Sequence, residues 1–148
     1  MNWIFLFIAF LLGVANTAQS GINSQLRVSL NNPILAAILS FMSGLIVLIG
    51  AYALFNQSAI PTLDSFRQIT WWKFTGGLLG AFYVVSVIFI VQDLGPANML
   101  CLIVAGQLIS ALIIDHYGWL GFSVHAINLP RVLGSVLLIL GVYLILKY

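Results

Sequence analysis

The sequence predicts an all-α integral membrane protein with five membrane-spanning helices. Of its 148 residues, 62% are hydrophobic and only 5% are charged, whereas soluble proteins carry about 25% charged residues. A soluble domain of this length could not cover its surface with so few polar groups. Five apolar stretches of about 20 residues are each long enough to cross the ~30 Å hydrocarbon core as a helix, because a helix rises about 1.5 Å per residue.

The boundaries of these stretches carry residues typical of helix starts. Pro33, Pro96 and Pro130 stand where a helix begins, and there a missing N–H costs no hydrogen bond. We expect the first stretch to be retained rather than removed as a signal peptide, because no Lys or Arg precedes it and no A-x-A pattern follows it. We expect the chain to form one transmembrane domain. Its predicted helices cover residues 3–22, 33–55, 72–91, 96–114 and 130–146.

The basic residues specify the orientation in the membrane only weakly. With five spans, the N-terminus and the second and fourth loops share one face, which holds three basic residues against two on the other. Two outcomes remain open. The chain could insert both ways and form an inverted dimer of about ten helices, which is a transporter architecture, or it could insert only with its N-terminus inside. The three basic residues are Arg67, Lys73 and Arg131, and the two are Arg27 and Lys147.

Polar side chains in the apolar stretches are the candidates for function. Asn16, Gln19 and Asn23 are spaced by three and four, so they share one helical face, and exposing that face to lipid would be costly. We expect it to line a substrate path; alternatively, the amides only hold helices together. Tyr83 and Gln107 mark smaller polar patches in the third and fourth stretches, and with the three amides they form the predicted substrate-binding set.

Asp115 is the acidic residue of most interest, because it ends the fourth stretch, where the helix dipole is unfavourable to a carboxylate. His116 or Arg131 could compensate for that charge. A role in proton coupling, through a carboxylate whose neutral form is favoured in apolar surroundings, is one interpretation. The other is a helix cap or an ion pair at the membrane interface.

The sequence argues against several function classes. Two histidines and three acidic residues, without a paired carboxylate, a Ser-His-Asp set, a metal-ligand cluster or a glycine-rich phosphate loop, leave no catalytic residues to propose. We therefore predict no enzyme, no cofactor and no metal. The basic residues are too scattered for nucleic acid, and the single Cys101 cannot form an internal disulfide.

The order of several motifs resembles the YdcZ-like branch of the drug/metabolite transporter superfamily. The segment 13–30, GVANTAQSGINSQLRVSL, is followed by Pro33 and then by SFMSG at 40–44. Later matching pieces are the Trp71-Trp72 pair, GGLLGA at 76–81, Gly106-Gln107, IDHYG at 114–118 and RVLG at 131–134. The resemblance covers essentially the whole chain.

The resemblance implies a bacterial inner-membrane protein made of a five-helix unit. Larger relatives in the superfamily contain two such units in inverted orientation, so a short member is expected to act as a dimer. Small four-helix exporters of the superfamily use a glutamate in the first helix to exchange protons for cations. This chain has no glutamate, so the resemblance does not carry over cationic substrates.

The predicted function is that of a secondary transporter that exports a small metabolite or drug-like molecule by alternating access as a dimer. Its expected partners are membrane lipid, the small-molecule substrate and a second copy or a homologous subunit. The alternative is a membrane scaffold or regulatory subunit that transports nothing and whose polar face docks a partner helix.

Overall fold

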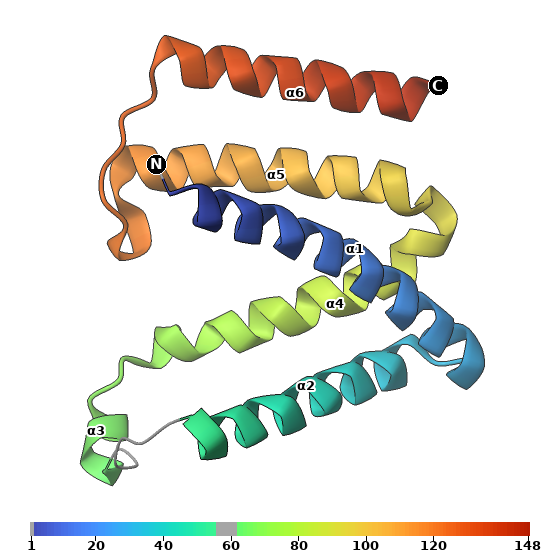
Figure 1. The fold of residues 1–148 in the computed structure, drawn as a ribbon, viewed down its shortest axis with the longest axis vertical. Helices are drawn as coiled ribbons and strands as arrows, with labels where there is room; N and C mark the ends of the chain where they lie inside the picture. Colours follow the sequence, from blue (N-terminus) through green and yellow to red (C-terminus); the bar gives the residue numbers. More distant parts are fainter. Residues whose placement is uncertain (1, 56–61) are drawn as a thin grey trace. The chain divides into compact units, whose positions relative to one another are not determined.

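The computed structural model describes residues 2–55 and 62–148, and over these residues it contains helices and no strands (Figure 1). Within the described residues, five helical segments are long and apolar enough to cross a membrane. The helices are α1 (Trp3–Leu30), α2 (Pro33–Phe55), α3 (Leu63–Arg67), α4 (Thr75–Leu94), α5 (Pro96–Tyr117) and α6 (Leu129–Lys147), with short 3-10 helices at Trp71–Phe74 and Trp119–Gly121.

The first helix is longer than the sequence predicts, because it continues to Leu30 instead of ending near residue 22. No proline or glycine interrupts the segment 22–30, and the helix ends only at Asn31, which adopts a left-handed backbone conformation with φ 49°. A helix of 28 residues is about 42 Å long. The ends of the other predicted spans differ from the observed ones by three residues or fewer.

Asparagine side chains cap the starts of three helices. The side-chain oxygens of Asn2, Asn32 and Asn128 accept hydrogen bonds from backbone N–H groups two or three residues further on, at 3.0 to 3.1 Å. Each cap satisfies donors that the first turn of a helix leaves unpaired. The loop predicted at 56–70 falls partly outside the described residues, and its remainder contains α3.

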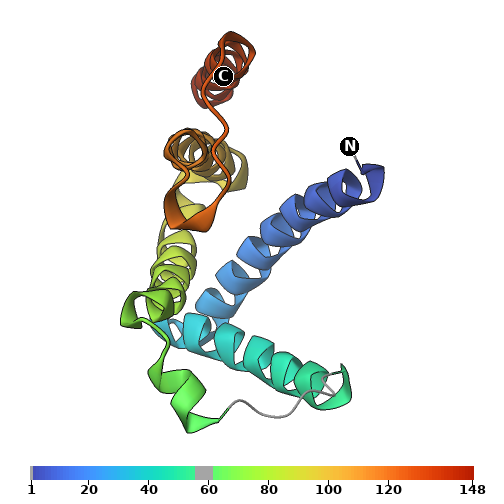
Figure 2. The same cartoon turned by 90° about the vertical axis from the view of Figure 1, so that its left-hand side faces the viewer.

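The chain divides into two compact units, Met1–Gln92 and Asp93–Tyr148, and each is described by itself. The prediction of a single transmembrane domain concerns how these units assemble in the bilayer and stays a prediction. In the first unit, α1 and α2 meet at the turn after Leu30 and diverge away from it (Figure 2).

The core of the first unit lies near that turn. Ala36 and Ala37 of α2 are buried against Ile88 of α4, with Leu26 and Leu30 of α1 packed around them. Small alanine side chains let helices approach closely in a membrane, where dispersion contacts replace the hydrophobic effect as the attraction between helices.

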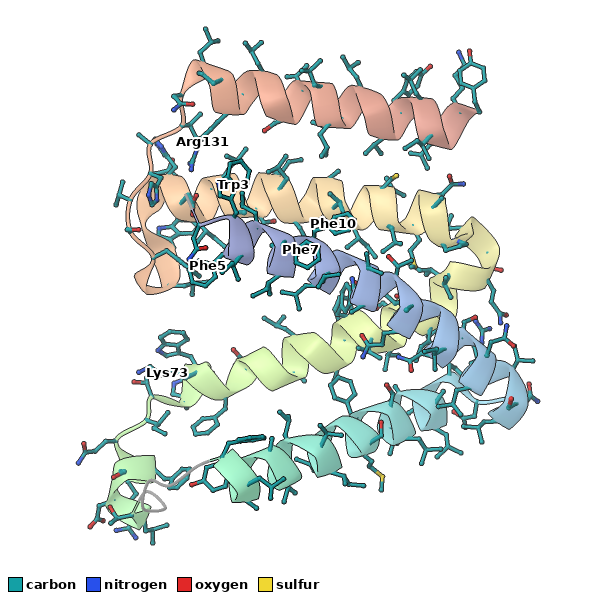
Figure 3. The ribbon with its side chains drawn as sticks, in the orientation of Figure 1. Trp3, Phe5, Phe7, Phe10, Lys73 and Arg131 are labelled. Carbon is teal, nitrogen blue, oxygen red and sulfur yellow. The ribbon has the colours of Figure 1, made fainter. Side chains whose placement is uncertain are left out.

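The N-terminal half of α1 is an apolar surface in this unit. Trp3, Phe5, Phe7 and Phe10 are each more than half exposed (Figure 3). Acyl chains are as apolar as these rings, so the bilayer is the solvent that such a surface requires.

The second unit is a pair of antiparallel helices, α5 and α6, that lie side by side (Figure 1). The connecting segment is held against the end of α5, since the His125 backbone N–H donates to the Asp115 carbonyl at 2.8 Å. The Ile127 N–H donates to His116 Nδ1 at 3.2 Å. Gly118 ends α5 with φ 64°, a conformation that glycine adopts without steric cost.

We predict that Gly118→Ala destabilises the second unit. A side chain at positive φ costs about 1–2 kcal/mol, and the added Cβ would lie 2.7 Å from Val124 Cγ2, so the valine would also have to shift. Stability can be measured by titrating the detergent-solubilised protein with dodecyl sulfate. Gly141→Ala, in α6 with no atom within 4 Å of the added Cβ, is the control and should stabilise by up to about 1 kcal/mol. Equal effects of Gly118→Ala and Gly141→Ala would contradict the need for glycine at the end of α5.

Candidate functional site

The middle of α1 carries a polar face that begins at Asn16. Asn16, Ser20, Asn23 and Arg27 follow one another at intervals of three and four residues, so they line up along the helix. Ser20 and Asn23 are only 3% and 4% exposed. A polar face this deep in an apolar helix needs partners in the protein, because the hydrocarbon core supplies none.

Tyr83 of α4 provides the first partner. The Asn16 side-chain Nδ2 donates to the Tyr83 hydroxyl at 2.9 Å, and the bond is partly buried. The sequence singled out both residues, and the structure brings them together although they are 67 positions apart in the chain. This bond joins α1 to α4 near the middle of both spans.

Two further polar links join the same two helices closer to the turn. Gln92 Nε2 donates to the Ser24 hydroxyl at 3.2 Å. Arg27 Nη1 donates to the backbone carbonyls of Ile88 and Phe89 at 2.9 and 3.0 Å. The guanidinium also lies 5.6 Å from the centre of the Phe89 ring.

Arg27 was counted in the sequence only as a topological charge, so its role in packing was missed. Its carbonyl partners, Ile88 and Phe89, lie six and five residues before the end of α4 at Leu94. The signal was present in the spacing, because Arg27 follows Asn23 by four residues and so continues the polar face. The prediction ended the first helix near residue 22 and therefore placed Arg27 in a loop.

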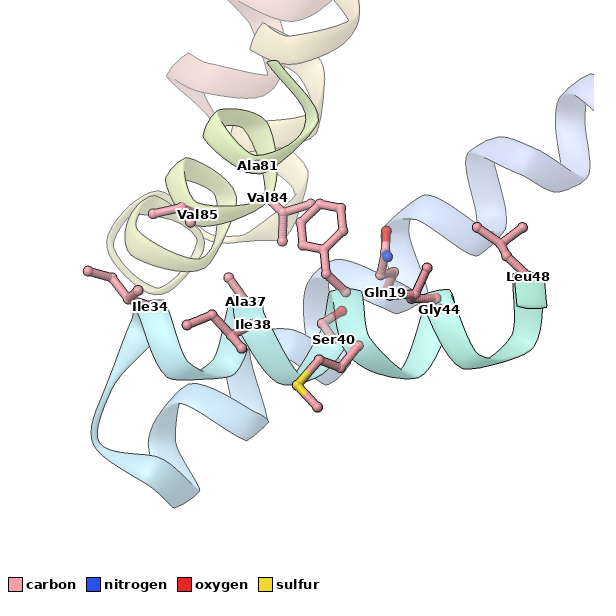
Figure 4. Close-up of a pocket in the computed structure, with 13 residues that line it drawn as sticks. Gln19, Ile34, Ala37, Ile38, Ser40, Gly44, Leu48, Ala81, Val84 and Val85 are labelled. Atoms are coloured by element: carbon pink, nitrogen blue, oxygen red, sulfur yellow. The ribbon is translucent and has the colours of Figure 1, made fainter. Parts of the chain in front are cut away.

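Gln19 differs from its polar neighbours because it lines a groove. The groove has a volume of about 820 Å³ and is formed by residues of α1, α2 and α4 (Figure 4). Its wall on α2 includes Ser40 and Gly44, and its wall on α4 includes Ala81 and Val84. None of its lining residues is charged.

The predicted substrate set is thus only partly gathered in one place. Asn16, Gln19, Asn23 and Tyr83 belong to the first unit, where Asn23 is buried and does not line the groove. Gln107 lies exposed on α5 in the second unit. The assignment of all five residues to substrate binding stays a prediction.

Asp115 pairs with Arg131 in the second unit. Its Oδ2 lies 3.4 Å from Arg131 Nη1, and both side chains are 34% exposed. Arg131 Nη1 also donates to the His125 carbonyl at 3.1 Å. The pair compensates the carboxylate at the C-terminal end of α5, where the helix dipole opposes it. The proton-coupling role of Asp115 stays a prediction.

Metal chemistry has no visible site in the part of the chain that the structure describes. Across residues 2–55 and 62–148, no three His, Cys, Asp or Glu side chains gather as metal ligands.

Comparison with known proteins decides the family. The family model described as "Putative inner membrane exporter, YdcZ" matches residues 4–144. The chain belongs to this YdcZ family. Inner membrane protein YdcZ of Escherichia coli (strain K12) is 28% identical over 144 residues, which are 96% of this chain and 95% of that protein. No solved structure matches the chain.

Membership in the YdcZ family agrees with the apolar helices. A chain of this family whose described residues contain five helices able to span a membrane is an inner membrane protein. The family description is that of an exporter, which is a transport protein and not an enzyme class.

We predict that the Asn16–Tyr83 bond stabilises the packing of α1 on α4. Asn16→Ala and Tyr83→Phe should each destabilise the protein, and the double variant should lose less than the sum, with a coupling energy of about 1 kcal/mol. Unfolding by dodecyl sulfate measures all three variants. Thr17→Ala is the control, because the Thr17 hydroxyl donates within its own helix to the Gly13 carbonyl. Its effect should add to that of Tyr83→Phe, and a fully additive Asn16–Tyr83 pair would refute the link.

Proposed function

We propose that this member of the YdcZ family is a secondary transporter that exports a small metabolite or drug-like molecule across the inner membrane. The observation that carries the proposal is the groove at Gln19, which places a polar amide beside a space of about 820 Å³ among apolar spans. Spaces of roughly 300–1,000 Å³ are usual for small-molecule sites. The exporter description of the family supports the same direction of transport.

The position of the groove along the helices fits alternating access. Gln19 is near the middle of α1, and Gly44 is near the middle of α2. Transporters bind their substrates near the bilayer midplane and expose the site to one side at a time by rocking one repeat against another. A single five-helix unit lacks the second repeat that this motion requires.

A second copy of the chain is the proposed second repeat. The N-terminus shares one membrane face with the second and fourth loops, and this face carries Arg67, Lys73 and Arg131. The other face carries Arg27 and Lys147. A difference of one basic residue orients a chain weakly. The proposal therefore includes insertion in both orientations and assembly as an inverted dimer surrounded by membrane lipid. The larger superfamily relatives with two inverted units support this arrangement by analogy.

The alternative is a scaffold or regulatory subunit that transports nothing. One observation favours it, since Asn16 and Ser24 use their side chains to bond α4. Amides that serve only to hold helices together would need no water-filled path. Gln19 distinguishes the transporter from the scaffold, because its side chain lines the groove instead of forming a hydrogen bond with α4.

We predict that Gln19 is reached by water. With Cys101 replaced by Ala, Gln19→Cys should react with a charged, water-soluble methanethiosulfonate in intact membranes, and the product can be counted by mass spectrometry. Val47→Cys is the control, because Val47 is 69% exposed on α2 and faces a wholly apolar surrounding in the bilayer. Protection of both cysteines would favour the scaffold.

We also predict dual insertion. A reporter of membrane side attached to Tyr148 should give signal from both the cytoplasm and the periplasm when the intact chain is expressed. Adding two basic residues to the second loop, through Gln68→Lys and Thr70→Lys, should move the signal to the periplasm, because that loop would then be held inside. Signal from one side alone in the unmodified chain would remove the inverted homodimer from the proposal.

A further inference from the structure

The groove at Gln19 also specifies the chemical class of its occupant. We propose that it takes an uncharged, largely apolar molecule that carries one hydrogen-bonding group, and that the Gln19 amide holds that group. This inference rests on the proposed function, since it names the substrate class of the same site. Its support comes from the lining, from the placement of charge in the first unit and from the side on which the groove is open.

The lining offers dispersion contacts with very few polar ones. Phe41, Leu45 and Leu48 of α2 and Val84 and Val85 of α4 are among the apolar residues that line the groove. Each pair of apolar atoms gains little, but a molecule enclosed by such side chains makes many contacts at once. An occupant that matches this lining is mainly hydrocarbon or aromatic.

Charge is excluded by what surrounds the groove. No carboxylate lines it, so a cation leaving water would find no counter-charge, and an unpaired ion in an apolar site costs several kcal/mol. An anion would also lack a counter-charge in the groove, because Arg27 is not part of the lining and its Nη1 donates to two backbone carbonyls of α4. Asp64 and Arg67 pair with each other on α3, outside the spans.

Gln19 supplies the polar end of the site. A glutamine amide offers two N–H donors and an accepting oxygen, so it can bind a hydroxyl, a carbonyl or an amide equally well. A few placed polar groups in an apolar pocket are the usual means of fixing a ligand's orientation. Ser40 is the other polar residue in the lining.

The open side of the groove indicates how such a molecule arrives. Leu45 and Leu48, which lie in the wall on α2, are 55% and 67% exposed. In a bilayer these side chains meet acyl chains, so the groove is continuous with the hydrocarbon core. A molecule that partitions into the membrane enters the groove laterally, and it leaves to water when alternating access opens the site at Gln19 to one aqueous side.

A matched pair of photoreactive probes tests the proposal on the full-length protein in liposomes. One probe is a trifluoromethyl-phenyldiazirine bearing a benzylic hydroxyl, and the other is the same diazirine bearing a trimethylammonium group instead. After illumination, mass spectrometry of the α2 peptides reports labelling, with and without an excess of the non-photoreactive benzylic alcohol. We expect labelling of the segment 41–48 by the hydroxyl probe that the excess alcohol suppresses, and no such suppressible labelling by the cationic probe.

Two substitutions tie the labelling to the groove. Gly44 lies in the wall of the groove, so Gly44→Leu should fill the groove and abolish the suppressible labelling. Gly50→Leu, on the same helix but outside the lining, should leave the labelling unchanged. Both glycines have open space around them. Gln19→Leu should raise the half-saturating probe concentration by about two- to tenfold, the worth of one hydrogen bond. Gln25→Leu, at an exposed position of α1 outside the lining of the groove, is its control.

Three outcomes would overturn the inference. Labelling that no competitor suppresses would mean that acyl chains fill the groove. Equal suppressible labelling by the cationic probe would refute the charge argument, and insensitivity to Gly44→Leu would place the probe elsewhere. If Gln19→Cys reacts with the water-soluble reagent but no labelling is suppressible, the protein is a transporter of another substrate class. If Gln19→Cys is protected and no labelling is suppressible, the proposed transport function itself is wrong.

Discussion

The requirement that every polar group in the hydrocarbon core finds a partner organises the first unit. The α1 helix carries amides, hydroxyls and the Arg27 guanidinium, and α4 pairs with them through Tyr83, Gln92 and two carbonyls near its end. Because water cannot replace these partners, separating the two helices would strand several polar groups at once. The register of α1 on α4 follows from that cost, and this register places Gln19 in the lining of the groove between α1, α2 and α4.

The sequence predicted the architecture well because one physical quantity, the length of an apolar run, decides membrane spans. Four of the five spans agree with the structure within three residues, and Pro33 and Pro96 begin their helices as predicted. The first span was wrong at its C-terminal end. Polarity was taken there as the end of a helix, whereas the segment 23–30 stays helical because α4 satisfies its polar side chains.

The candidate site was harder to predict, because residue spacing shows which side chains share a helical face but not which neighbouring helix that face contacts. Asn16, Gln19 and Asn23 look equivalent in the sequence, yet Asn16 bonds Tyr83, Asn23 is buried and Gln19 lines the groove. The difference arises from about 60° of rotation around α1, which spacing alone cannot assign to a partner. Asp115 shows the same limit: the sequence offered His116 and Arg131 as compensating groups, and only the fold places Arg131 beside it.

The length of α1 makes the bilayer itself a determinant of the geometry. A helix of 28 residues exceeds the hydrocarbon thickness by about 12 Å and can remain in the membrane by inclining to the normal. Its inclination must then change with lipid composition, since a thicker bilayer accommodates a more upright helix. Asn16, Ser24 and Arg27 fasten the C-terminal half of α1 to α4, so only the aromatic half before Asn16 is free to follow that change. Lipid thickness would in this way set how far the N-terminal half of α1 stands from α2, whereas the groove at Gln19 lies between the Asn16 and Arg27 attachments and keeps its width.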